Sequence, residues 1–157
     1  GDKATALTAY KKAIELNFDM LQADYSVNVP ATNLLTVSVR DAFLANPAVV
    51  PALVDFNLSH IMLQKYIAMY GFGAIETWVD MRRYHYTDVK DGFQVYRDFT
   101  TPPLTGTNGL WPDNNGNLVY RVRYRYNSEY VWNIEELKRL GADALDWHTK
   151  EVWFSKP

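Results

Sequence analysis

Cysteine is absent from the 157 residues, which excludes disulfides, a thiol nucleophile and cysteine-ligated metal sites. An excess of basic charge is also missing, because the formal net charge is -2 at pH 7. Binding to nucleic acid needs a basic face, so no nucleic-acid partner is predicted. The hydrophobic content of 48% is that of an ordinary globular protein. No apolar run approaches the ~20 residues of a membrane-spanning helix.

Catalytic and cofactor-binding motifs are missing too. There is no nucleophile elbow, phosphate loop or dinucleotide-binding glycine pattern, and no two of the three histidines share a metal-ligand spacing on one helix. Glu76 and Asp80 lie four residues apart on one helical face, as paired acid–base carboxylates can. Arg83 follows Asp80 by three residues, however, and a salt bridge between them is the better interpretation. We therefore predict no catalytic residue and no cofactor.

The segment from Asp113 to Asn117 begins like a calcium-binding loop. Leu118 and Tyr124 occupy the positions where such a loop needs glycine and a bidentate acid. The Asn115-Gly116 pair is instead a strong turn signal. The sequence therefore predicts a turn here and no metal site.

Helical periodicity is the main structural signal. Residues 2–22 predict an amphipathic helix whose apolar positions recur at spacings of three and four, namely Leu7, Tyr10, Ile14, Phe18 and Leu21. Residues 58–84 predict a helical hairpin with Ser59 as its N-cap and a corner at Gly71–Gly73. Residues 133–140 predict a short helix that ends at Gly141.

The remaining segments are less regular. Residues 23–33 predict a loop, and residues 34–45 suit either a strand or a helix. Residues 87–118 predict a long loop, and residues 118–126 alternate as a strand or an extended wrap would. The aromatic tail from Trp147 to Phe154 is expected to pack down. We thus predict a mostly α fold in one domain, residues 1–157, with a long irregular aromatic C-terminal wrap.

The best candidate for a ligand site is Trp111 with its neighbours Asp113 and Asn114. A tryptophan in this loop is either a core anchor or an exposed platform on which a sugar ring stacks, while adjacent Asp and Asn side chains bond hydroxyl groups. A ridge of three arginines, Arg121, Arg123 and Arg125, interleaved with tyrosines, could bind an anion or single-stranded nucleic acid, although pairing with local acids is the better interpretation.

Three segments together resemble a known family. They are Ile61–Gly71 continuing through Glu76–Arg83 (IMLQKYIAMYG…ETWVDMRR), Arg121–Glu129 (RVRYRYNSE) and Lys150–Phe154 (KEVWF). In order and spacing they are similar to the C-terminal region of the SusD/RagB family of nutrient-binding outer-membrane lipoproteins. Arg125 and Asn127 depart from the Tyr-Pro pattern of the family. The Ala6-Tyr10-Ala13 spacing adds to the resemblance, because it is typical of tetratricopeptide-like helices, on which the family is built.

The resemblance implies a cell-surface protein, lipid-anchored in the outer membrane, that captures glycans or other nutrients without enzymatic activity. Its partner would be a SusC-like TonB-dependent transporter. The lipidated cysteine and most of the helical scaffold of the family are missing here, so we expect a C-terminal fragment that binds the N-terminal part of its parent. Two rivals stay open: a helical protein-interaction scaffold with no small-molecule ligand, and a glycoside hydrolase with aromatic subsites.

The apolar face of the first helix also bears on the fragment hypothesis. In a tetratricopeptide-like pair each helix buries this face against its neighbours. The predicted helix from Ile61 to Tyr70 can cover part of it. If the rest of the cover came from a missing N-terminal region, an apolar patch near Tyr10 and Ala13 would be exposed.

Overall fold

The computed structural model describes residues 1–97, 99 and 109–156. Its helices are α1 (Lys3–Tyr25), α2 (Val37–Ala45), α3 (Leu58–Ala68), α4 (Ala74–Arg83) and α5 (Ile134–Leu140). Short helical turns are η1 (Ala31–Asn33), η2 (Pro112–Asn114), η3 (Tyr126–Tyr130) and η4 (Trp147–Thr149), and two short strands are β1 (Val89–Lys90) and β2 (Phe93–Gln94). The predicted mostly α fold is confirmed, whereas a tetratricopeptide-like arrangement stays a prediction.

The chain divides into two compact units. The first contains Gly1–Thr77 and Asp88–Arg97, and the second contains Trp78–Thr87 and the described residues after Arg97. This division does not say whether the units fold together, so the single domain expected from the sequence stays a prediction.

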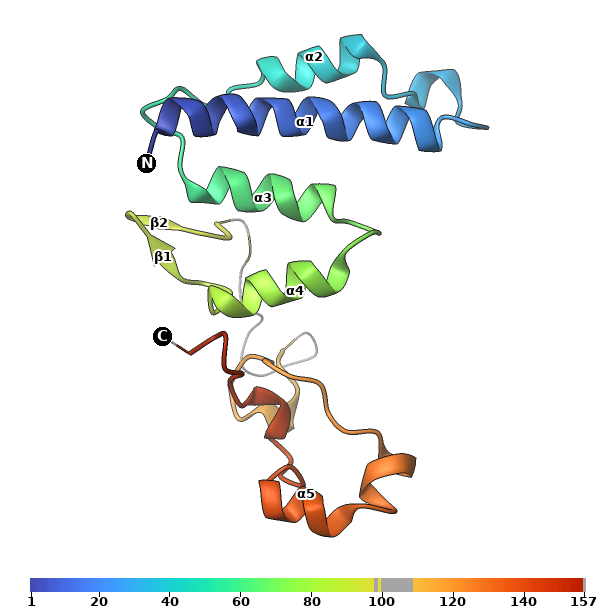
Figure 1. The fold of residues 1–157 in the computed structure, drawn as a ribbon, viewed down its shortest axis with the longest axis vertical. Helices are drawn as coiled ribbons and strands as arrows, with labels where there is room; N and C mark the ends of the chain where they lie inside the picture. The colour runs from blue at the N-terminus through green and yellow to red at the C-terminus, as the bar shows by residue number, and fades with distance from the viewer. Residues whose placement is uncertain (98, 100–108, 157) are drawn as a thin grey trace. The chain divides into compact units, whose positions relative to one another are not determined.

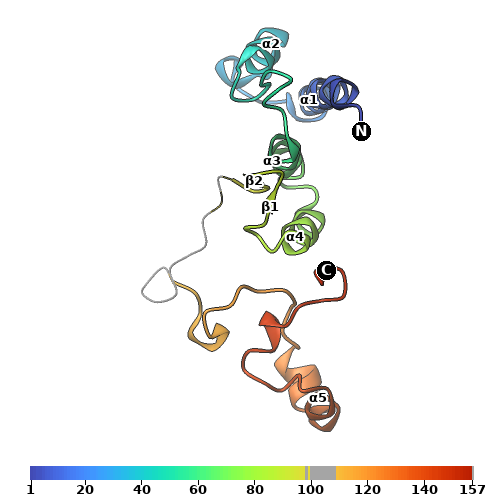
Figure 2. The ribbon, with the colours of Figure 1, turned by 90° about the vertical axis from the view of Figure 1, so that its left-hand side faces the viewer.

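The core of the first unit lies on one face of α1. Tyr10 and Ile14 are buried with Phe56, and the Tyr10 and Phe56 rings lie 5.1 Å apart. The surrounding side chains are partly buried and come from α1, α2, α3 and the segment after α2; they are Ala6, Leu7, Phe18, Phe43, Leu44, Val49, Val50 and Ile61. Figures 1 and 2 show α2 alongside α1. Much of the cover that the sequence assigned to a missing region therefore comes from within the chain.

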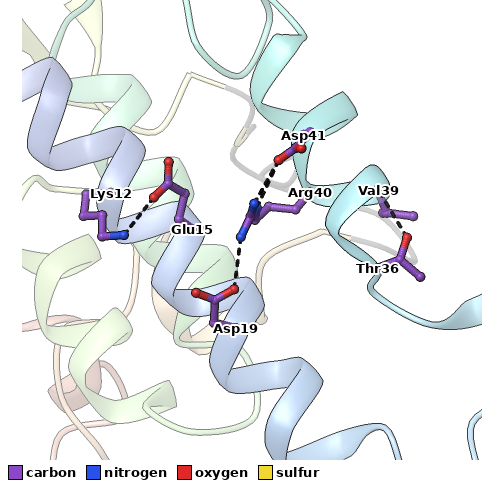
Figure 3. A network of polar contacts seen from close by, with 7 residues as sticks. All are labelled: Lys12, Glu15, Asp19, Thr36, Val39, Arg40 and Asp41. Carbon is purple, nitrogen blue, oxygen red and sulfur yellow. Dashed lines mark hydrogen bonds and ion pairs between the residues drawn. The ribbon is translucent and has the colours of Figure 1, made fainter.

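Polar contacts hold α2 along α1 (Figure 3). The Arg40 guanidinium on α2 lies 3.2 Å from the Asp19 carboxylate on α1 and 3.1 Å from its neighbour Asp41. On the same helix as Asp19, Lys12 pairs with Glu15 at 2.9 Å. Such partly exposed pairs contribute little stability, so burial of the apolar face remains the main stabilising term.

Two boundaries in the first unit differ from the predictions. Helix α1 continues to Tyr25, through residues expected to be a loop, because no glycine or proline interrupts it before Pro30. The N-cap of α3 is Asn57 and not Ser59, since the Asn57 side chain accepts a hydrogen bond from the Ser59 amide at 3.0 Å. The ambiguous residues 34–45 form helix α2, and the Thr36 side chain caps it.

The helix break predicted at Gly71–Gly73 is confirmed. Helix α3 ends at Ala68 and α4 begins at Ala74. Gly71 has φ of 81°, a left-handed conformation that glycine adopts without a Cβ clash. Arg82 and Arg83 lie in the last turn of α4, where cations suit the helix dipole.

A β-hairpin occupies part of the segment predicted to be a loop. Val89 pairs with Gln94 and Lys90 with Phe93. Between them Asp91 and Gly92 have φ values of 52° and 81°, as a two-residue hairpin turn of type I′ requires. The Asp-Gly pair was a signal for this turn that the prediction overlooked. Residues 98 and 100–108 of the same predicted loop lie outside the described residues.

In the second unit, residues 118–125 form an extended wrap and not a strand. The backbone amides of Tyr120 and Arg121 both donate to the carbonyl of His148, at 2.8 and 3.1 Å, without forming a ladder. The short helix α5 is confirmed, and Gly141 ends it with φ of 66°. The tail packs only in part, because Ser155 is buried whereas Trp153 is exposed.

Candidate functional site

The predicted ligand residues lie on a tight turn in the second unit. Pro112 opens the turn η2, since its ring fixes φ near the helical value. The amide of Asn114 donates to the carbonyl of Trp111 at 2.9 Å. Asn115 and Gly116 then follow with φ of 51° and 77°, a conformation that favours asparagine and glycine. The turn predicted from the Asn-Gly pair is therefore present.

Trp111 presents its ring to solvent. The side chain is 67% exposed, so the alternative of a core anchor is wrong. Its indole Nε1 donates a hydrogen bond to Oδ2 of Asp113 at 3.1 Å. This bond satisfies the one polar group of the ring and restrains the ring plane, which leaves a flat apolar surface accessible.

Asp113 connects the tryptophan to the extended wrap. Its Oδ2 atom lies 3.8 Å from Nη1 of Arg123, and both side chains are partly exposed. The expected pairing of this arginine with a local acid is therefore confirmed. An ion pair of this kind contributes little stability, so its main effect is to orient the carboxylate beside the Trp111 ring.

Asn114 points inward, unlike its neighbours. It is 3% exposed, and its Oδ1 lies 2.6 Å from Nε2 of His148, which is also buried. An amide oxygen only accepts, so Nε2 carries the proton in this bond. The side chain of Asn114 therefore anchors the turn to η4 and is not available to a ligand. Sequence reasoning missed the role of His148, because 34 residues separate the partners and no local pattern joins them.

Further aromatic rings surround the wrap. The Arg121 guanidinium lies 4.4 Å from the centre of the Trp147 ring, and Tyr124 stacks on the same ring at 5.9 Å. Arg121 also donates to the backbone carbonyls of Lys150 and Glu151, so its predicted pairing with acids is replaced by backbone contacts. Other aromatic side chains of this unit are exposed; they are Tyr126, Trp132 and Trp153.

Arg82 links the first and third of the segments that carry the family resemblance. Its side chain is buried, its Nη1 donates to the carbonyl of Tyr120 at 2.7 Å, and its Nε donates to that of Trp78 at 3.2 Å. The guanidinium lies 3.8 Å from the centre of the Trp78 ring and 4.9 Å from that of Phe154. Burial lowers the pKa of Arg82. The Arg82 guanidinium thus contacts Trp78 of its own segment, Tyr120 just before the second segment and Phe154 at the end of the third.

Candidate catalytic groups gain no support from their surroundings. Asp80 is buried, and Oδ1 of Asp80 lies 3.9 Å from Nη1 of Arg83, as the sequence predicted. Over residues 1–97, 99 and 109–156, no group of three or more metal-binding side chains comes together. None of the helices in the described part of the chain is both long and apolar enough to cross a membrane.

The first unit contains a hollow of about 510 Å³. Phe56 and Ile61 supply apolar wall, and Lys3 and Asp55 supply opposite charges. The Lys3 ammonium already donates to the carbonyl of Val54 at 2.8 Å. This mixed lining does not select one chemical class of ligand, so the turn at Trp111 is the better candidate site.

Comparison with protein-family models, curated proteins and solved structures gave no significant match.

Proposed function

We propose that this chain is the C-terminal part of a SusD/RagB-type nutrient-binding lipoprotein and that it binds glycan without catalysing a reaction. The parent protein would be anchored by lipid at the cell-surface face of the outer membrane. Its N-terminal part would complete the tetratricopeptide-like scaffold, and a SusC-like TonB-dependent transporter would receive the ligand. The contacts of Arg82 support this proposal, because they link the first resembling segment to the third and to Tyr120, the residue before the second.

The observation that carries the glycan hypothesis is the exposed ring of Trp111. Sugar rings expose flat patches of C–H groups that stack on aromatic faces, and the indole here is already oriented by Asp113. Both described contacts of Asp113 use Oδ2. We assign Oδ1 as the acceptor for a sugar hydroxyl, whereas Asn114, being buried, supports the turn.

Isothermal titration calorimetry tests this proposal, with maltoheptaose and cellohexaose as probes of α- and β-linked glucans. Trp111→Ala should abolish the binding of whichever probe binds, while the melting temperature stays nearly unchanged because the ring is exposed. Trp132→Ala is the matched control, since it removes another exposed tryptophan from a different turn. Binding that survives Trp111→Ala but not the control would contradict the assignment of the site.

The absence of catalysis is tested separately. We expect no release of reducing sugar from either probe above a buffer control, because Asp80 is buried and paired with Arg83. Sugar release that Asp80→Asn removes would favour the glycoside hydrolase alternative.

A helical scaffold that binds protein is the second candidate function. It is favoured by exposed apolar side chains around the corner after α3, namely Tyr70, Phe72 and Ile75. The centres of the Phe72 and Tyr25 rings lie 5.7 Å apart, which extends this apolar surface to the end of α1. Glycan binding that depends on Trp111 would argue against this candidate. If neither probe nor a wider glycan panel binds, the scaffold becomes the better hypothesis.

A further inference from the structure

Helix α1 carries a second apolar stripe that its own unit leaves uncovered. The stripe consists of Ala9, Ala13, Leu16 and Met20, at spacings of four, three and four. Ala9 and Ala13 are exposed, and Leu16 and Met20 are 55% and 38% exposed. At 100° per residue the stripe lies about a third of a turn from the buried face of α1. The apolar patch expected near Ala13 therefore exists, but on a neighbouring face and not on that of Tyr10.

The spacing of the stripe is that of a coiled-coil seam, in which one helix packs against another along a heptad pattern. Its small residues are in the N-terminal half and its large residues are in the C-terminal half. A parallel partner of the same sequence would place large side chains on large and small on small. An antiparallel partner would place Leu16 against Ala13 of the partner subunit and Met20 against Ala9 of the partner subunit.

Charge on α1 follows the same division. The basic residues Lys3, Lys11 and Lys12 come first, and the acidic residues Glu15, Asp19 and Asp24 follow. Lys12 and Asp19 flank the stripe on one side, and their side chains remain 61% and 53% exposed despite their contacts with Glu15 and Arg40. Antiparallel pairing would bring Lys12 beside Asp19 of the partner subunit twice, and it would also oppose the two helix dipoles.

We propose that a second copy of this chain, and not the N-terminal part of a parent protein, covers the α1 stripe in an antiparallel, two-fold symmetric dimer. The complementarity of size and charge along one helix selects a second copy, because each half of α1 fits the other half. The 23 residues of α1 extend ~34 Å. A seam formed by one helix pair is smaller than the ~1,600 Å² of a standard interface, so we expect a dissociation constant of ~10 µM to ~1 mM.

Sedimentation analysis of the full chain up to ~1 mM measures this association. Leu16→Glu should raise the dissociation constant at least ~10-fold, because it buries a charge in the seam. Lys12→Glu should weaken the dimer, because it places an acidic side chain beside Asp19 of the partner subunit. Lys11→Glu is the matched control, since it makes the same charge change away from the stripe. Circular dichroism confirms that each variant keeps its helices.

The orientation is tested by cross-linking, which the absence of native cysteine makes simple. Ala9→Cys mixed with Met20→Cys should form a mixed disulfide in preference to either homodimer. A chain that is monomeric at ~1 mM, a dimer indifferent to Leu16→Glu, or a predominance of Ala9→Cys homodimer would each overturn the proposal.

Discussion

The buried guanidinium of Arg82 offers the sharpest test of what holds the second unit together. Replacing it with methionine, as Arg82→Met, keeps a long apolar side chain but removes the charge and every donor. The carbonyl of Tyr120, 2.7 Å from Nη1, would lose its described partner from Arg82, and the contacts of the guanidinium with the Trp78 and Phe154 rings would disappear.

The expected loss follows from these contacts. A buried carbonyl left without its partner costs ~1–3 kcal/mol, and the lost cation–π contacts cost a further ~1 kcal/mol. Removing the buried charge also removes its desolvation cost and offsets part of this loss, so we expect Arg82→Met to destabilise by ~1–3 kcal/mol. Arg82→Lys keeps the charge but not the planar fork or its stacking, and should cost ~1–2 kcal/mol. Either loss is a large share of the ~5–15 kcal/mol that stabilises a domain.

Urea unfolding measures these differences, with circular dichroism for the helices and the indole NMR signal of Trp78 for this unit. Arg83→Lys is the control, because Arg83 is exposed and lysine keeps a cation beside the buried Asp80, so it should cost only ~0–1 kcal/mol. If Arg82→Met lowers the free energy of unfolding no more than Arg83→Lys does, Arg82 does not organise the unit and our reasoning is wrong.

Three further predictions concern single side chains. Burial, and then the charge of Arg97, lowers the pKa of His60, so the folded chain binds fewer protons at this side chain than the unfolded chain does. The melting temperature should therefore fall as the pH drops below about 6.5. The variant His60→Gln should show a smaller fall. At Asn115, whose φ is 51°, Asn115→Ala should cost ~1 kcal/mol in urea unfolding, while Asn115→Gly costs almost nothing; equal losses would contradict the conformational argument. Tyr10→Phe loses the 2.7 Å hydrogen bond from the Tyr10 hydroxyl to the Val49 carbonyl and should lower the free energy of unfolding by ~1 kcal/mol in thermal unfolding. Tyr10→Ala also removes the buried ring and should lower it by ~3–5 kcal/mol.

The helical parts of the fold could be predicted because their signals are local. The periodicity of Tyr10 and Ile14 identified the buried face of α1, and the glycines at 71 and 141 marked helix ends by their left-handed backbone. The N-cap of α3 was assigned two residues late. Asn57 and Ser59 are both good capping residues, and only the position of the side-chain oxygen Oδ1 of Asn57 decides between them.

The candidate site could be predicted only in part. The loop around Trp111 and its polar neighbours indicated a candidate ligand site. The exposure of its ring, however, depends on packing over the whole unit. The inward orientation of Asn114 depends on His148, and that of Arg82 on Tyr120, 38 residues away. Contacts at such separations leave no periodicity in one sequence, which is why the prediction treated Asn114 as a ligand residue and overlooked His148.

In the turn at residues 111–115, one side chain holds the turn in place and another faces solvent, and this separation affects how the sequence can evolve. Retention of the turn depends on Asn114, which faces inward to His148, whereas contact with the surroundings depends on Trp111, which faces outward. Because different side chains carry these two tasks, a substitution at Trp111 alters the outer surface with little effect on folding. Variation should therefore be tolerated at position 111 and resisted at position 114. A new preference for ligand could arise here by one substitution, without a compensating change elsewhere.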